Sequence, residues 1–126
     1  MSLSILYVED VDELRGTISE LLEEEGREVV AVANGESALQ ALEARTFDVI
    51  VTDVNLPGMS GTDLARRVLE TRPDHWIVIC SGYEFRHGLA RLGPNVRSMP
   101  KPFEIEALDA LMREIARHLG RAQAAR

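Results

Sequence analysis

Short apolar runs alternate with longer amphipathic stretches along this 126-residue chain, and that alternation restricts its fold more than any other feature. The apolar runs predict strands at 3–8, 28–32, 47–53, 76–81 and 95–99. The stretches between and after them predict helices near 12–25, 36–44, 62–71, 84–92 and 104–119, with apolar residues three and four positions apart. The middle runs are continuously apolar, as expected when both faces of a sheet are covered. The sequence therefore predicts an α/β fold, a doubly wound five-stranded parallel sheet with five helices.

Glycine and proline mark several expected element ends. Gly26 is placed to stop the first helix, and Pro73 follows the third. The fourth expected helix contains Gly88 and is followed by Gly93 and Pro94. Because glycine disfavours a helix interior by about 1 kcal/mol relative to alanine, we expect this helix to be short or mobile.

The composition is that of a globular domain, with 45% hydrophobic and 28% charged residues. The formal net charge of −7 disfavours direct binding of nucleic acid or of an anionic membrane surface. No apolar run approaches the ~18 residues of a membrane helix, and the N-terminus does not resemble a signal peptide. We expect a cytoplasmic domain over residues 1–120 with a tail over 121–126, and no membrane insertion.

Neither the single cysteine nor the three histidines are expected to take part in the chemistry of a site. Cys80 lies within the apolar run "WIVIC", which predicts a small buried hydrophobic residue and fits a reducing compartment. His75, His87 and His118 are scattered along the sequence and form no ligand pattern, so we expect them to be solvated.

Polar residues occupy four of the five expected strand ends. Glu9 and Asp10 follow the first strand, Asp53 ends the third, Ser81 ends the fourth, and the fifth leads to Lys101. The second strand ends without a charged group. In parallel sheets, sites form beyond the carboxyl ends of the strands. If the second strand lies at the sheet edge, the other four ends should face one pocket.

Three carboxylates in one pocket repel each other unless protons or a cation neutralise them. An all-oxygen ligand set suits Mg²⁺, which uses few carboxylates and keeps several waters. One of the acids would then remain able to attack phosphorus, because carboxylates can accept phosphoryl groups. Lys101 and Ser81 would bind the oxygens of that group.

Lys101 is the only lysine, whereas the other thirteen basic residues are arginine. It lies between Pro100 and Pro102 in "SMPKPF". A compact ammonium on a flexible stem suits one phosphoryl oxygen or carboxylate in a narrow pocket better than the broad fork of arginine. We therefore interpret Lys101 as a site residue.

Four motifs together resemble the receiver domain of two-component response regulators. They are "ILYVEDVDELR" with Glu9 and Asp10, "DVIVTDVNLPGMSG" with Asp53, "VICSG" with Ser81, and "PKPF" with Lys101. Their order and approximate spacing match over about residues 3–119. The resemblance implies a flavodoxin-like sheet with strand order 2-1-3-4-5.

The resemblance also implies roles for individual residues. Asp53 would accept a phosphoryl group from a phosphohistidine on a sensor histidine kinase or a histidine phosphotransfer domain. Glu9, Asp10 and Asp53 would hold Mg²⁺, with the backbone carbonyl of Asn55 as a further ligand. Ser81 would hydrogen-bond the phosphoryl group, and Lys101 would pair first with Asp53 and then with the phosphoryl oxygens. The side chains of Asn55 and Tyr83 would influence how fast the phosphate is lost.

One position departs from the family pattern. Many receivers carry an aromatic residue three positions before the lysine, where this chain has Ser98. The usual aromatic relay is therefore missing at that position, and Tyr83 or Phe85 is the candidate substitute. We expect the surface around the fourth helix to be unusual for the family.

The sequence leaves three functions to compare. The leading hypothesis is a phosphorylation switch that acts on its own Asp53, turns over no separate substrate and changes its protein partners. An alternative is a binding module that keeps the receiver fold without being phosphorylated. A haloacid-dehalogenase-type phosphatase is disfavoured, because Asn55 stands where a second acid would be needed. Only "GRAQAAR" follows the last expected helix, so an output domain is not expected here. A stand-alone regulator and a domain of a longer protein both remain open.

Overall fold

The structure is a computed structural model that describes residues 3–24, 26–81, 89–101 and 104–124. Its five strands are β1 (Ser4–Val8), β2 (Glu28–Val32), β3 (Val49–Asp53), β4 (Trp76–Ser81) and β5 (Val96–Pro100). All neighbouring strands pair in parallel, and their order across the sheet is β2-β1-β3-β4-β5. This is the parallel sheet that the apolar runs predict, with β2 at an edge.

The described residues contain four α-helices, not the five that we expected. They are α1 (Asp12–Glu23), α2 (Gly35–Ala44), α3 (Gly61–Thr71) and α4 (Ile105–Ala124). Of the expected helix at 84–92, residues 84–88 lie outside the described ranges, and Leu89–Leu92 form a single 3₁₀ turn, η2. A 3₁₀ turn suits such a short piece, because Gly93 and Pro94 follow it and proline lacks the N–H that would continue a helix.

The last helix also differs from the prediction at its end. It continues to Ala124, whereas we expected it to end near residue 119 and a tail to begin at 121. Residues 121–124 are Arg, Ala, Gln and Ala, all good helix formers, which explains why Gly120 does not stop the helix.

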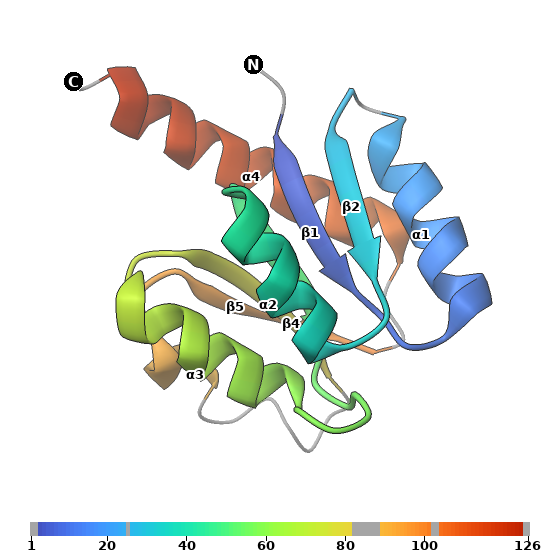
Figure 1. Cartoon of the computed structure of the whole chain (residues 1–126). Helices are drawn as coiled ribbons and strands as arrows, with labels where there is room; N and C mark the ends of the chain where they lie inside the picture. Colours follow the sequence, from blue (N-terminus) through green and yellow to red (C-terminus); the bar gives the residue numbers. More distant parts are fainter. Residues whose placement is uncertain (1–2, 25, 82–88, 102–103, 125–126) are drawn as a thin grey trace.

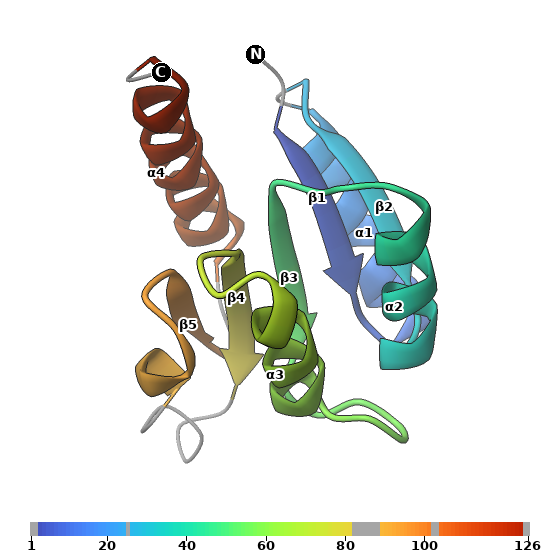
Figure 2. The same ribbon diagram turned by 60° about the vertical axis from the view of Figure 1, so that its left-hand side comes forward.

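Two helices cover each face of the sheet. Figure 1 shows α2 and α3 in front of the strands and α4 behind them, and α1 packs with α4 on the same core cluster. The turned view in Figure 2 shows that the carboxyl ends of β1, β3 and β4 point the same way. The fold therefore assembles those strand ends at one rim, as the sequence predicts.

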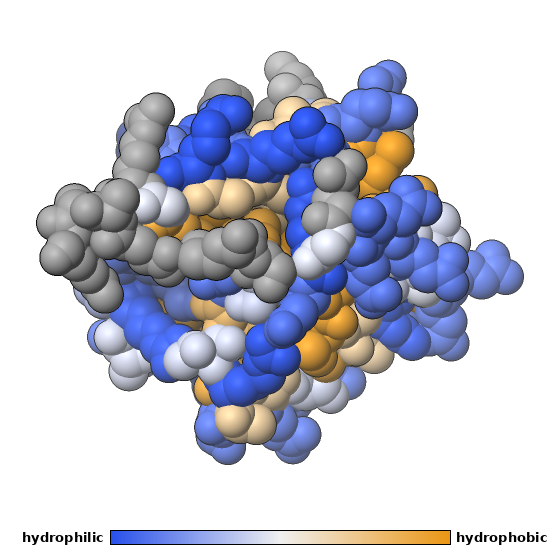
Figure 3. All heavy atoms as spheres, turned by 90° about the horizontal axis from the view of Figure 1, so that it is seen from above, coloured by the Kyte–Doolittle hydropathy of each residue, from blue (hydrophilic) through white to orange (hydrophobic). Residues whose placement is uncertain are grey.

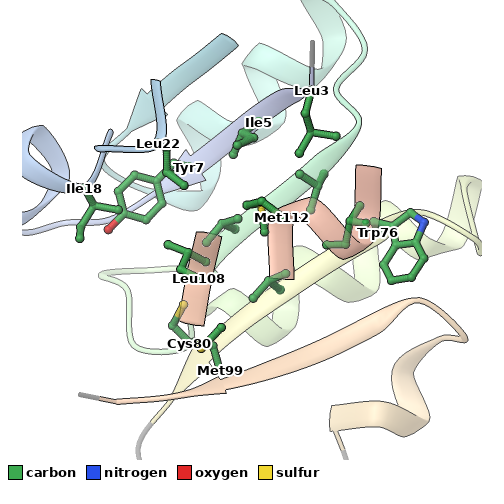
Figure 4. Close-up of a cluster of buried hydrophobic side chains, with 14 residues drawn as sticks. Leu3, Ile5, Tyr7, Ile18, Leu22, Trp76, Cys80, Met99, Leu108 and Met112 are labelled. Atoms are coloured by element: carbon green, nitrogen blue, oxygen red, sulfur yellow. The ribbon is translucent and has the colours of Figure 1, made fainter. Parts of the chain in front are cut away.

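Alternate residues of each strand point to opposite faces, so the core has two parts. One cluster joins β1, β3 and β4 to α1 and α4, and Figure 4 shows Tyr7, Leu22, Leu108 and Met112 among its side chains. The other packs Leu6, Ile50 and Ile79 against α2 and α3. Cys80 is 2% exposed within the first cluster, which confirms that it is a buried hydrophobic residue.

The surface is polar by comparison with these clusters. The view from above in Figure 3 shows mainly hydrophilic residues, with hydrophobic ones visible in patches between them. Among the residues that the structure describes, no helix combines the length and the apolar character needed to cross a membrane.

Candidate functional site

The site lies where β1, β3, β4 and β5 end, and backbone hydrogen bonds hold these ends in register. The N–H of Glu9 donates to the carbonyl of Val32 at 3.0 Å, which extends the pairing of β1 with β2. The N–H of Lys101 donates to the carbonyl of Ser81 at 2.8 Å. The residues that follow the strands are therefore fixed by the sheet itself.

Asp53 and Lys101 form the central contact of the site. The Lys101 Nζ donates to Asp53 Oδ2 at 2.7 Å, although the two residues are 48 positions apart in the sequence. Asp53 is buried at 8% exposure, and Lys101 is half-buried. Because both groups are shielded from water, their attraction is stronger than that of a surface ion pair.

The three acids meet around this pair. Carboxylate oxygens of Glu9, Asp10 and Asp53 all lie within 4.8 Å of one another. Glu9 is buried at 2% exposure, whereas Asp10 is open to solvent. Lys101 Nζ reaches Glu9 Oε1 as well, at 3.8 Å. Three carboxylates thus face one ammonium, and this excess of negative charge is what a divalent cation would neutralise.

The donor set fits Mg²⁺ in particular. All the candidate ligand atoms are oxygens, and the exposed side of Asp10 leaves space for the water molecules that Mg²⁺ retains. Asn55 follows two residues after Asp53 and is exposed, and its N–H donates to Asp53 Oδ1 at 3.4 Å. The loop that would offer the Asn55 carbonyl therefore folds back onto the phosphoacceptor candidate.

The electrostatic environment shifts the pKa of two site residues. Burial raises the pKa of Glu9, and its N–H contact from Val11 and the charge of Lys101 offset this only in part. Burial by itself would lower the pKa of Lys101. The hydrogen bond and charge of Asp53, with the charge of Glu9, outweigh that effect, so the pKa of Lys101 lies above its usual range. Lys101 is therefore a permanent cation at this rim.

Ser81 brings a buried hydroxyl to the same rim. The residue is fully buried, and no group in the described part of the chain hydrogen-bonds its Oγ. A buried polar atom without a partner is unfavourable and calls for an explanation, such as a ligand that is not part of the chain. Its position on β4, next to β3 and β5, is consistent with a hydroxyl kept for an incoming oxygen.

Sequence reasoning missed one residue that shapes the site. Arg15, in the first turns of α1, donates from Nη1 to the Glu9 carbonyl at 2.9 Å and from Nη2 to Asp12 Oδ1 at 2.6 Å. These two hydrogen bonds hold the loop that carries Glu9 and Asp10 against α1. The only hint in the sequence is an arginine that follows an acidic loop, and that pattern alone does not reveal the carbonyl contact.

The loop after Asp53 is held from both sides. Gly58 adopts a φ of 75°, a left-handed conformation that glycine tolerates best, and Ser60 caps α3 by accepting from the Asp63 N–H. Gly61 lies so close to the backbone of Asp53 that a Cβ at this position would overlap the Asp53 carbonyl oxygen. The first residue of α3 thus packs directly on the phosphoacceptor candidate.

Several other expectations have clear outcomes. Ser98 is exposed on β5, so its side chain points away from the site. Tyr83 and Phe85, the candidate substitutes for the aromatic relay, and His87, expected to be solvated, lie outside the described residues. The expectation that His75 is solvated is wrong. It is half-buried, with Nδ1 3.0 Å from the Trp76 carbonyl oxygen, because it directly precedes the buried strand β4.

The family model for the response regulator receiver domain matches residues 5–113. The chain is 32% identical over 110 residues to the response regulator receiver protein CpdR of Brucella abortus, covering 82% of this chain and 88% of that protein. It is 31% identical over 118 residues to the sensor kinase CckA of the same organism, covering 90% of this chain. This chain belongs to the response regulator receiver domain family.

Solved structures agree with this assignment. The response regulator TrrA of Thermotoga maritima, in complex with Mg²⁺ and BeF, is 27% identical, with a TM-score of 0.81 and coverage of 91% of this chain and 99% of that one. The match to CckA spans only 12% of that kinase, so receivers similar to this one occur both in short proteins and as parts of long ones.

Proposed function

We propose that this domain is a phosphoacceptor in a two-component phosphorelay in the cytoplasm. A sensor histidine kinase or a histidine phosphotransfer domain would supply the phosphoryl group, and Asp53 would receive it. The observation that carries the proposal is the 2.7 Å contact of Lys101 with Asp53 inside a cluster of three acids. A purely structural ion pair would not need the two further carboxylates, which repel one another.

The transfer assigns a task to each residue of the rim. An oxygen of the Asp53 carboxylate forms the new bond to phosphorus, while the bond between phosphorus and the donor breaks and its electron pair leaves with the donor. The Lys101 ammonium, freed from Asp53, binds an oxygen of the transferred group. The unpartnered Ser81 hydroxyl donates to another.

Glu9, Asp10 and Asp53 would hold the Mg²⁺ that this chemistry uses, with the backbone carbonyl of Asn55 as a further ligand. When bound, Mg²⁺ neutralises part of the charge on the transferred phosphoryl oxygens. Arg15 fixes the loop of the first two ligands through the Glu9 carbonyl. The TrrA complex with Mg²⁺ and BeF supports this assignment by similarity.

The output of the domain is a change in protein binding, and the domain turns over no separate substrate. A phosphoryl group on Asp53 would favour one of two conformations, and a partner that binds one of them better would report the change. The exposed Ser98 implies that this switch does not use a ring at that position.

Mass spectrometry after incubation with acetyl phosphate and Mg²⁺ tests the proposal. We expect a mass gain of one phosphoryl group that requires Mg²⁺ and is lost in Asp53→Asn. Asp63→Asn is the matched control, because Asp63 is an exposed acid of α3 that pairs with Arg66 at the surface. This control should be modified as fully as the unaltered protein.

A second function competes because of Ser98. A receiver without the aromatic relay could work as a binding module that is never phosphorylated. A chain that gains no mass with acetyl phosphate, with another small donor or with a phosphorylated histidine phosphotransfer domain would support this alternative and contradict the proposal.

A further inference from the structure

A groove between α2 and α3 lies away from the phosphoacceptor rim. It has a volume of about 400 Å³, with a floor of Leu39, Leu42 and Val68 and a border of Glu43, Arg67 and Arg72. The two leucines are only half-buried, although they pack against the core cluster of this face. The groove thus offers apolar surface that the chain itself does not cover. Its volume falls in the range of sites that bind ligands or peptide side chains.

The charges at the border of this groove are unusual for the molecule. The chain carries a net charge of −7, yet the groove has two guanidinium groups and one carboxylate. In the described part of the chain neither Arg67 nor Arg72 forms an ion pair, whereas the adjacent Arg66 pairs with Asp63. Both groove arginines are exposed. Unpaired arginines beside apolar surface are typical of the anchors of protein interfaces.

A second groove on the opposite face shows that this arrangement is specific. The groove between α1 and α4 has Glu24, Glu106 and Asp109 at its border, and its one arginine, Arg27, is already bound to Asp109 at 2.8 Å. That border is acidic, and its cation is satisfied. An acidic partner would therefore be repelled by the α1–α4 groove and attracted by the α2–α3 groove.

We propose that the α2–α3 groove binds an acidic amphipathic helix of a partner protein. Apolar residues at positions i, i+3 or i+4, and i+7 of that helix would cover Leu39, Leu42 and Val68. Arg67 lies on α3 and Arg72 directly follows its last residue, so carboxylates one to two turns apart on the partner would reach both. The binding is a property of the unmodified domain and does not depend on the proposed phosphorylation.

A designed peptide tests this directly. The probe is a fluorescein-labelled, lactam-stapled helix of about four turns, with leucines at i, i+4 and i+7 and glutamates beside them. A second peptide replaces each glutamate with lysine. Titrations use the full chain without Mg²⁺ or a phosphodonor, so the result is independent of Asp53 chemistry. We expect saturable binding of the glutamate peptide, at least about tenfold tighter than that of the lysine peptide.

Two charge-matched double variants locate the binding. Arg67→Glu with Arg72→Glu should weaken binding of the glutamate peptide at least about tenfold. Arg66→Glu with Arg117→Glu makes the same change in net charge at exposed positions outside the groove, and should alter binding less than about threefold. All the changed side chains are exposed, so both variants should fold, and circular dichroism and thermal melting verify this.

Several results would overturn the proposal. They are the absence of saturable binding, equal binding of the two peptides, and an equal loss in the two double variants, which would indicate only a net-charge effect. Amide shifts in two-dimensional NMR should appear at Leu39, Leu42 and Val68, and shifts confined to the α1–α4 groove would contradict the assignment. Self-association that Arg67→Glu with Arg72→Glu abolishes would assign the groove to a second copy of the chain instead.

Discussion

The two faces of the sheet are closed by different kinds of contact. On the α1/α4 face, the nearly buried Arg27 ties the start of β2 to Asp109 of α4, and three core residues of α4 are fully buried, Leu108, Met112 and Ile115. On the α2/α3 face, close contacts at two glycines join the helices to Asp53 and the loop after it. A Cβ at Gly35 would lie 3.0 Å from the Met59 sulfur, and one at Gly61 would meet the Asp53 backbone.

This difference separates a contact that lies away from the site from contacts that adjoin it. An ion pair between α4 and the start of β2 holds the α1/α4 face without touching the site. The α2/α3 face begins at the loop after Asp53, where Gly61 of α3 packs on the Asp53 backbone. We therefore expect the packing of α3 to depend on the backbone position of Asp53, whereas the pair formed by Arg27 and Asp109 contributes to stability away from the site.

The largest expected effect comes from Gly61→Ala, which disrupts the packing contact between α3 and the Asp53 backbone. The added methyl group would overlap the Asp53 carbonyl, and neither backbone can move without shifting α3 or β3. We expect the free energy of unfolding, measured in urea, to fall by about 3 kcal/mol. The matched control is Gly16→Ala in α1, where a Cβ meets nothing within 4 Å.

Gly16→Ala should instead raise the free energy of unfolding by about 0.5–1 kcal/mol, because alanine favours a helix interior over glycine. If Gly61→Ala lowers the free energy of unfolding no more than Gly16→Ala does, α3 is not packed tightly against the Asp53 backbone. The contrast between the two faces would then be wrong.

The second expected effect concerns the support on the α1/α4 face. Arg27 is 7% exposed at its side chain, and its partner Asp109 is 27% exposed. Replacing Arg27 with Met keeps much of the packing but removes the ion pair, so we expect the free energy of unfolding in urea to fall by about 2 kcal/mol.

The pair formed by Arg66 and Asp63 on α3 spans 3.5 Å between largely exposed groups. Arg66→Met should therefore change stability by less than about 0.5 kcal/mol. Equal losses would show that burial does not distinguish the two pairs.

The sequence predicts the candidate site better than it predicts these face contacts, and the reason is geometric. In a parallel sheet all carboxyl ends lie at one rim, so the topology alone brings Asp53 near Lys101 across 48 residues. The contacts of Arg15 with the Glu9 carbonyl and of Gly61 with Asp53 depend on how a loop closes and how a helix is placed. The hydrophobic periodicity of the sequence contains no information on loop closure or on helix placement.

The same limit explains the other differences. A hydrophobic pattern marks a helix face but not the groove that two neighbouring helices leave open, so the α2–α3 groove could not be predicted. The pattern at 84–92 is compatible with a helix, but it does not say that Leu89–Leu92 close as a 3₁₀ turn. His75 was misjudged because burial at the start of a strand depends on neighbours from other elements, here the segment near Phe47 and Asp48.

The smallest expected effect follows from His75 and gives the amino end of β4, near the C-terminus of α3, a dependence on pH. Burial lowers the pKa of His75, and the charge of Arg72 at the end of α3 lowers it further, against the opposing contact with the Trp76 carbonyl. The unfolded chain therefore binds a proton at this position at higher pH than the folded chain. It follows that the free energy of unfolding falls as the pH drops through the usual titration range of histidine.

Urea unfolding at about pH 7.5 and about pH 5.5 measures this contribution when the chain is compared with His75→Gln. The unaltered chain should lose more stability between the two pH values than the variant does, by less than the losses expected for Gly61→Ala and Arg27→Met. Glu9, whose pKa is raised by burial, takes up a proton first in the folded state and acts in the opposite direction, but it is present in both proteins and cancels. Equal losses in the two proteins would mean that His75 is as accessible to protons in the folded chain as in the unfolded one. The contacts of the His75 ring with the backbone of Trp76 and Phe47 would then not shield it from solvent.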